Sequence, residues 1–168
     1  MSSARQAAAL NVQMKRNYDF SRRMLDGLLE DFTSEEALER VGDFKPLVWY
    51  LGHIAVAENA WLQLHRGAES VLPEGHMSRY SRGSDGDADF GDASLDEMTS
   101  LLGTLRERMK GAIAEIEPED LERETPVDVF PPLKQCGNAF ALVCGHNAYH
   151  AGQIQLLRRA MGKPATFG

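Results

Sequence analysis

Helical periodicity is the feature of this sequence that most limits its fold. In four long stretches, apolar residues recur every three or four positions, and turn residues separate these stretches. This period places the apolar side chains on one face of an α-helix, which must then be covered by a core. The clearest stripe consists of Leu95, Met98, Leu101, Leu102, Leu105, Met109, Ile113 and Ile116. No segment has a convincing strand pattern, so the sequence predicts an all-α fold.

Capping residues and prolines set the expected limits of the first two helices. The first helix is expected over residues 4–31. Thr33 and Glu36 have the spacing of a capping box, which predicts a short helical turn after them. Pro46 suits the first turn of the second helix, which is expected to end near Arg66.

The last two helices have similar signals. Ser94 and Glu97 form a second capping-box pattern at the start of the third helix, and Pro118 ends it. The fourth helix is expected to begin within residues 133–139 and to end at Met161, where a Gly-Lys-Pro sequence stops it.

Two connections between the expected helices are long. Residues 67–93 carry several Gly, Ser and Asp residues without an apolar period, and residues 118–132 contain four prolines. Loops of this length in compact domains are often lids or walls of sites. The pattern predicts an antiparallel four-helix bundle with long connections between helices 2–3 and 3–4. A length of 168 residues suits one domain that spans residues 1–168.

Composition excludes several classes of protein. A net charge of -7 lacks the basic surface that a nucleic-acid-binding protein needs. No run of about 18 uncharged apolar residues is present, and residues 1–15 lack the apolar region of a signal peptide, so we expect a cytoplasmic protein without membrane contact. The spacing of Cys136 and Cys144 matches no common zinc pattern, and we expect two buried thiols in a reducing compartment.

The fourth helix carries two histidines at helical spacing. On a wheel of about 100° per residue, His146 and His150 lie within about 20° of the centre of its buried stripe. That stripe is defined by Ala139, Leu142, Val143, Ile154 and Leu157. Imidazoles four residues apart on a helix can converge on one metal ion. The pattern alone also fits two core histidines that are bonded to their neighbours, so both interpretations remain open.

The second helix offers one histidine and one carboxylate of interest. His53 lies about 90° from the centre of its stripe, so it can face a neighbouring helix but need not do so. Glu58 falls within the apolar stripe, where a carboxylate should be paired or functional. Because it lies about 140° from His53, the two are not expected to share an ion. His65 and His76, at a helix end and in a glycine-rich loop, are expected to be solvated.

Two segments resemble signatures of the DinB/YfiT-like superfamily. Residues 49–55 with Glu58 are similar to its second-helix signature, and residues 145–154 with the Leu-Arg-Arg at 157–159 are similar to its fourth-helix signature. The resemblance extends over essentially the whole chain. It implies a four-helix bundle that binds a divalent metal ion through three histidines. Carried onto this sequence, these are His53, His146 and His150.

The resemblance also implies a class of chemistry. A three-histidine set leaves a position open for water or substrate, as in catalytic sites. Superfamily members with assigned activities are mainly thiol-dependent S-transferases, or isomerases that use a low-molecular-weight thiol, and several members are linked to stress response. The resemblance therefore implies a metalloenzyme of the thiol-dependent transferase or metal-assisted hydrolase type, which acts on a small electrophilic molecule. Its metal would be Zn, Ni or Fe, with a low-molecular-weight thiol as a further cofactor.

Some details of the family pattern are absent or open. Ala151 and Gly152 follow His150, so the His-x-Glu extension of relatives that use iron for sulfoxide chemistry is missing. Relatives are often dimers, so a homodimer is expected. A non-catalytic metal-binding or interaction bundle remains an alternative, as does a bundle with purely structural histidines.

Four polar residues near the three histidines are candidates for catalysis or substrate contact. They are Tyr50, Glu58, Tyr149 and Gln153. Gln153 lies one helical turn from His150, where it can bond a ligand imidazole and fix its orientation. Tyr149 lies about 80° from the centre of the stripe, which also fits a helix–helix contact.

Overall fold

All regular structure in the described part of the chain is helical. The computed structural model describes residues 3–84, 90 and 92–166. The long helices are α1 (Ser3–Leu29), α3 (Leu47–Arg66), α5 (Leu95–Ala114) and α6 (Cys136–Ala160). The short ones are α2 (Ser34–Leu38), α4 (His76–Tyr80) and the 3-10 turns η1 (Pro118–Glu122) and η2 (Pro131–Leu133). These ranges contain no strand, apart from an isolated bridge between Glu124 and Gln135, so the all-α prediction is confirmed.

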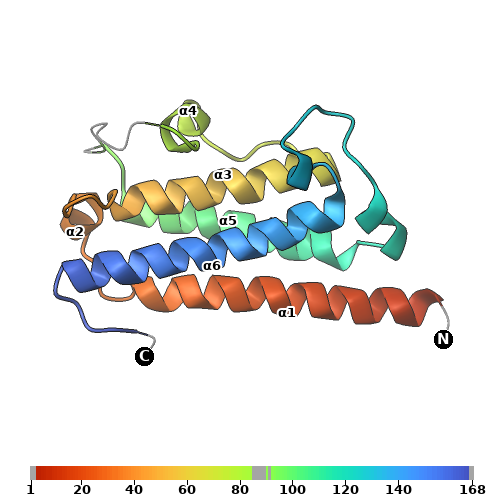
Figure 1. Cartoon of the computed structure of the whole chain (residues 1–168), viewed down its shortest axis with the longest axis horizontal. Helices are drawn as coiled ribbons and strands as arrows, with labels where there is room; N and C mark the ends of the chain where they lie inside the picture. The colour runs from red at the N-terminus through yellow and green to blue at the C-terminus, as the bar shows by residue number, and fades with distance from the viewer. Residues whose placement is uncertain (1–2, 85–89, 91, 167–168) are drawn as a thin grey trace.

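The four long helices lie side by side (Figure 1). Helix α3 packs against both α5 and α6, and α1 packs against the same two helices. Asn11 near the start of α1 donates a hydrogen bond to the carbonyl of Ala114 at the end of α5. Near the other end of α1, Arg158 of α6 donates to the carbonyl of Leu28. Helices α1 and α6 therefore run in one direction, and α3 and α5 run in the opposite direction (Figure 1).

The sequence predicted an antiparallel four-helix bundle, and this arrangement has both antiparallel and parallel neighbours. The pairs α1–α5 and α3–α6 are antiparallel, but α1–α6 and α3–α5 are parallel (Figure 1). The physical reason lies in the connection between α3 and α5. Helix α3 has 20 residues and is about 30 Å long. The connection from α3 to α5, residues 67–94, is long enough to return the chain over that distance. Helix α5 therefore starts at the same end of the molecule as α3.

The first predicted capping box forms in full, and the second forms only its Ser94 half. The Thr33 hydroxyl accepts a hydrogen bond from the Glu36 amide at 3.2 Å, and the Glu36 carboxylate accepts one from the Thr33 amide at 2.8 Å. At the start of α5, the Ser94 hydroxyl accepts from the Glu97 amide at 3.4 Å. Helix α3 ends at Gly67, whose φ of 63° lies in the left-handed region that glycine adopts without strain.

The core lies between the four long helices, but the buried face of α6 is not quite the predicted one. Leu142, predicted to lie in the core, is 39% exposed. Asn147, outside the predicted stripe, is fully buried. The stripe was defined by apolar residues alone, although large apolar side chains are common on protein surfaces. Among the described helices, none is both long and apolar enough to cross a lipid bilayer.

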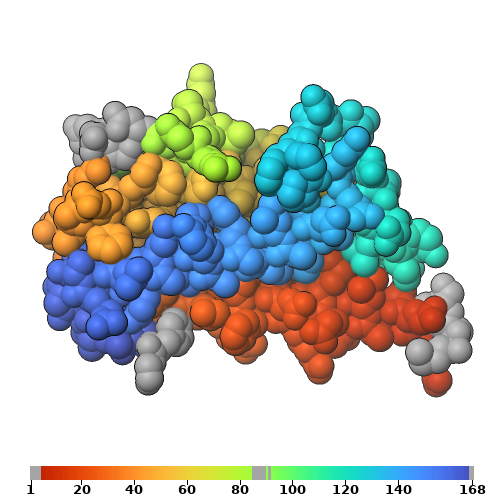
Figure 2. Space-filling model, viewed as in Figure 1, coloured from red at the N-terminus to blue at the C-terminus, as the bar shows by residue number. Residues whose placement is uncertain are grey.

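The segment between α3 and α5 is not wholly irregular. It contains α4, which packs on the outer side of α3, and Figure 2 shows this segment standing above α3 on the surface of the molecule. Helix α4 has five residues and no apolar period, so the sequence pattern could not reveal it.

Candidate metal centre

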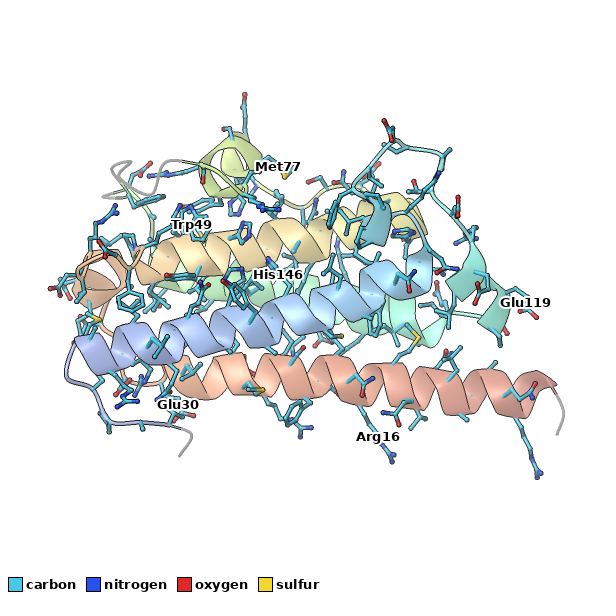
Figure 3. All side chains as sticks on the ribbon, in the orientation of Figure 1. Arg16, Glu30, Trp49, Met77, Glu119 and His146 are labelled. Atoms are coloured by element: carbon cyan, nitrogen blue, oxygen red, sulfur yellow. The ribbon has the colours of Figure 1, made fainter. Side chains whose placement is uncertain are left out.

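Three histidines from two helices meet at one place. His53 comes from α3, and His146 and His150 come from α6. One ring nitrogen from each histidine lies within 4.8 Å of those of the other two. Figure 3 shows the labelled His146 side chain between α6 and α3. The Nε2 atoms of His146 and His150 are 3.0 Å apart. Two ligands of a tetrahedral ion with ordinary metal–nitrogen bonds would lie about 3.3 Å apart, so a small adjustment suffices to fit an ion.

Hydrogen bonds fix the orientation of two of these rings. His53 Nδ1 donates to the carbonyl oxygen of Tyr80 at 2.7 Å, and His150 Nδ1 donates to Gln153 Oε1 at 2.6 Å. Both partners are oxygen acceptors, so each Nδ1 carries the proton and each Nε2 presents a lone pair. His146 Nδ1 is buried and has no partner among the described residues.

Burial keeps the three imidazoles neutral. It lowers the pKa of His146 to about 3, with the neighbouring His150 and His53 acting in the same direction. Burial and His53 lower the pKa of His150 to about 4, while its bond to Gln153 opposes this change. Burial also lowers the pKa of His53. At neutral pH all three rings are in the form that binds metal ions.

A stacked arrangement supports His53 on one side. The Trp49 ring lies parallel to the His53 ring, with centroids 4.7 Å apart and an angle of 15° between the planes. Trp49 Nε1 donates to the Ser84 hydroxyl at 2.9 Å. Lys45 Nζ lies 3.9 Å from the centroid of the Trp49 ring. The loop after α4 therefore helps to hold the ring that orients His53.

Helix α4 supports His53 from another side, through a contact with Gly52. A Cβ atom on Gly52 would lie 2.4 Å from Cγ of the Tyr80 ring, so glycine is needed for this close approach. His76 Nε2 donates to the carbonyl oxygen of Gly52 at 3.1 Å. These two contacts bring the Tyr80 carbonyl to its bond with His53.

The prediction that His65 and His76 are solvated is wrong. Their exposed fractions are 5% and 4%. His65 Nε2 donates to the Leu133 carbonyl at 2.8 Å, as His76 does to that of Gly52. Both acceptors are backbone carbonyls far away in the sequence, so no sequence pattern near either histidine indicates its hydrogen bond.

The three histidines open onto a cavity of about 550 Å³. Its other lining residues include Asp43, Lys45, Tyr50, Arg82, Tyr149 and Gln153. The Tyr50 ring lies 5.8 Å from the His150 ring, between centroids. Gln153 Nε2 donates to the Tyr149 hydroxyl at 3.1 Å, so Gln153 links an exposed tyrosine to His150. The structure thus places the candidates Tyr50, Tyr149 and Gln153 beside the histidines.

The fourth candidate, Glu58, lies elsewhere. It is fully buried between the helices and does not line this cavity. Its Oε1 accepts hydrogen bonds from Asn147 Nδ2 at 2.8 Å and Arg22 Nη1 at 3.3 Å. Burial raises the pKa of Glu58, and the charge of Arg22 opposes that change. Glu58 is therefore paired in the interior, and its partner Asn147 escaped the sequence analysis because only apolar residues defined the stripe.

The two cysteines do not join the histidines. Cys136 is fully buried and Cys144 is partly buried. Burial raises the pKa of both thiols, that of Cys144 to about 12. Both are protonated at neutral pH and are poor nucleophiles or metal ligands in that form.

Comparison with known proteins agrees with this geometry. The sequence profile of the DinB superfamily matches residues 17–154. No curated protein matches the chain. Among solved structures, a conserved protein from Enterococcus faecalis is similar in fold, with a TM-score of 0.70 and 14% identity over 92% of this chain and 98% of that one. Because the matched residues span most of the chain and include all three histidines, this chain belongs to the DinB superfamily.

Proposed function

We propose that this protein is a metal-dependent enzyme built on a four-helix bundle, with His53, His146 and His150 as the ligands of one divalent ion. The observation that carries the proposal is the convergence of three neutral imidazoles on one point. Membership of the DinB superfamily supports the same proposal of a metal site.

The positions of the protons on the three imidazoles favour a bound cation over three purely structural histidines. His53 and His150 both use Nδ1–H for bonds to oxygen, so both present an Nε2 lone pair to the cluster. His146 can donate one proton to the Nε2 of His150, but the cluster then has no further proton for the Nε2 lone pair of His53. A cation satisfies the converging lone pairs, whereas three histidines alone do not.

The surroundings favour a catalytic over a structural metal site. Among the described residues, no cysteine, aspartate or glutamate joins the three histidines as a fourth ligand. The cluster also opens onto a cavity large enough for a small molecule. Three protein ligands with one accessible position are typical of catalytic sites.

The chemistry follows from these parts. His53, His146 and His150 would hold a divalent ion that would lower the pKa of a bound thiol or water and so provide a nucleophile at neutral pH. Burial raises the pKa of Tyr50, so its hydroxyl stays protonated and can donate to a substrate. Tyr149 and Gln153 are placed to contact the same substrate from the α6 side. We propose that the sulfur of a low-molecular-weight thiol gives up its proton to solvent and forms a bond to an electrophilic carbon of a small molecule, as the bond from that carbon to its leaving group breaks. The metal would be Zn, Ni or Fe.

Elemental analysis tests this proposal. Untagged protein purified without chelators should contain close to one divalent ion per chain, and the His150→Ala variant should lose it. Incubation of the loaded protein with small thiols and electrophiles should then give conjugates. A parent protein that contains no metal and binds no added Zn, Ni or Fe would refute the proposal. Stoichiometric metal without conjugation or hydrolysis would favour the non-catalytic alternative.

A further inference from the structure

We infer that Asn147 and Glu58 are positioning residues, whose hydrogen bond sets the rotation of α6 against α3 and so brings the three histidines together. The inference rests on the proposed metal site. It concerns residues that lie outside the cavity and touch neither metal nor substrate.

The bond joins the two helices that carry the ligands. Asn147 lies between His146 and His150 on α6, and Glu58 lies five residues after His53 on α3. Asn147 Nδ2 donates to Glu58 Oε1 at 2.8 Å. Both residues have an exposed fraction of 0%, so water does not compete for this bond.

Arg22 extends the connection to the other two long helices. From α1, its Nη1 donates to Glu58 Oε1 at 3.3 Å, and its Nη2 donates to the carbonyl oxygen of Leu102 in α5 at 2.9 Å. Arg22 is 2% exposed. The carboxylate that Asn147 contacts is therefore held by α1 and α5 as well as by α3.

A metal site needs more angular precision than apolar packing supplies. A helix with its side chains has a radius of about 6 Å, so a histidine Nε2 lies roughly 6 Å from the axis. A rotation of 10° about the axis then moves this atom by about 1 Å, whereas metal–ligand distances tolerate only about 0.2 Å. Apolar packing is not directional, so it restricts the rotation of a helix about its own axis only loosely. A directional bond within the α3–α6 interface supplies the missing restriction.

Stability does not account for this network. Placing a charged pair in the interior carries a desolvation penalty that apolar side chains of the same size avoid. In addition, Asn147 Oδ1 and Arg22 Nε are buried and have no hydrogen-bond partner among the described residues. A partly satisfied buried network is less favourable than an apolar core. Its presence next to the ligand histidines points to orientation as its role.

A triple variant separates orientation from stability. Arg22→Met, Glu58→Leu and Asn147→Leu together replace the network with apolar side chains of similar size. The metal-free variant should unfold at the same temperature as the metal-free parent or higher. Its affinity for Zn²⁺ should fall at least tenfold, and the visible absorption of bound Co²⁺ should differ from that of the parent. A triple variant with the parent's affinity and Co²⁺ spectrum would overturn the inference.

A single substitution serves if the triple variant does not fold. Asn147→Ala removes the bond and leaves the Glu58–Arg22 pair. Its matched control is Leu105→Ala, a fully buried position on α5, which carries no ligand. We expect Leu105→Ala to lower the melting temperature without changing Zn²⁺ affinity, and Asn147→Ala to lower the affinity at least tenfold. Unchanged affinity in Asn147→Ala would overturn the positioning role alone, whereas a parent that binds no metal would overturn the proposed function with it.

Discussion

At the scale of single residues, the candidate centre depends on acceptors for the outer ring nitrogens. Gln153, three residues further along the same helix, accepts the hydrogen bond from His150. The Tyr80 carbonyl, in another segment, accepts the one from His53. Each acceptor fixes a tautomer, aims the Nε2 lone pair at the cluster and makes the ring a stronger ligand. The side-chain acceptor, Gln153, can be changed by substitution, so its contribution is measurable.

Substitution of Gln153 should weaken metal binding without unfolding the protein. Gln153→Leu removes the acceptor of His150 Nδ1–H, and losses of this kind cost about 10–100-fold in metal affinity. Gln153→Glu keeps an acceptor at the same place and should retain the affinity of the parent. Competition with a chromophoric chelator gives both values, with circular dichroism as the control for folding. Equal affinity in the leucine variant would mean that packing alone orients His150.

The same scale shows what a sequence can reveal about a site. The His146–His150 pair and Gln153 were predictable because their spacing along one helix determines their proximity. His65 and His76 were not, because their acceptors lie 68 and 24 residues away and are backbone carbonyls. Glu58 stood out as a carboxylate in an apolar stripe, and the structure confirms that it is paired.

At the scale of elements, the short helix α4 matters more to the site than its length suggests. The four long helices were predictable because their apolar residues follow the helical period. Helix α4 has no such pattern, and the direction of α5 depends on a connection without periodic signal. Yet α4 supplies the carbonyl that accepts the hydrogen bond from His53. It can pack this closely on α3 only because residue 52 is a glycine, which has no Cβ.

An alanine at position 52 should disturb both stability and metal binding. In Gly52→Ala the new Cβ would meet the Tyr80 ring at 2.4 Å, so α4 must move and the bond from His53 to Tyr80 must lengthen. Overpacking of this kind costs about 1–3 kcal/mol. The matched control is Gly103→Ala in α5, where a Cβ meets nothing within 4 Å and should stabilise the helix by up to about 1 kcal/mol. Thermal unfolding and Zn²⁺ titration of both variants check this, and equal stability of the two would contradict it.

At the scale of the whole molecule, the buried histidines connect folding to pH. Their pKa values are lowered from an ordinary value of 6.5, so between these values the unfolded chain binds more protons than the folded protein. The contribution of these histidines to the free energy of unfolding of the metal-free protein therefore decreases as the pH falls below about 6.5. Glu58 acts in the opposite direction, because its pKa is raised and its contribution is lost as the pH rises. The histidine contribution is thus best isolated by comparing a parent with a variant.

His146→Gln should reduce this pH dependence by a calculable amount. A group with a pKa of about 3 when folded and 6.5 when unfolded lowers the unfolding free energy by about 1.6 kcal/mol between pH 6.5 and pH 5. The glutamine cannot titrate, so urea unfolding of metal-free protein over this range should show a smaller loss for the variant than for the parent. Metal-loaded parent should be more stable than metal-free parent but lose stability with a similar slope, because the folded imidazoles of His146 and His150 are neutral with or without the ion over this range. Parallel curves for metal-free parent and variant would show that His146 is not held neutral by the fold.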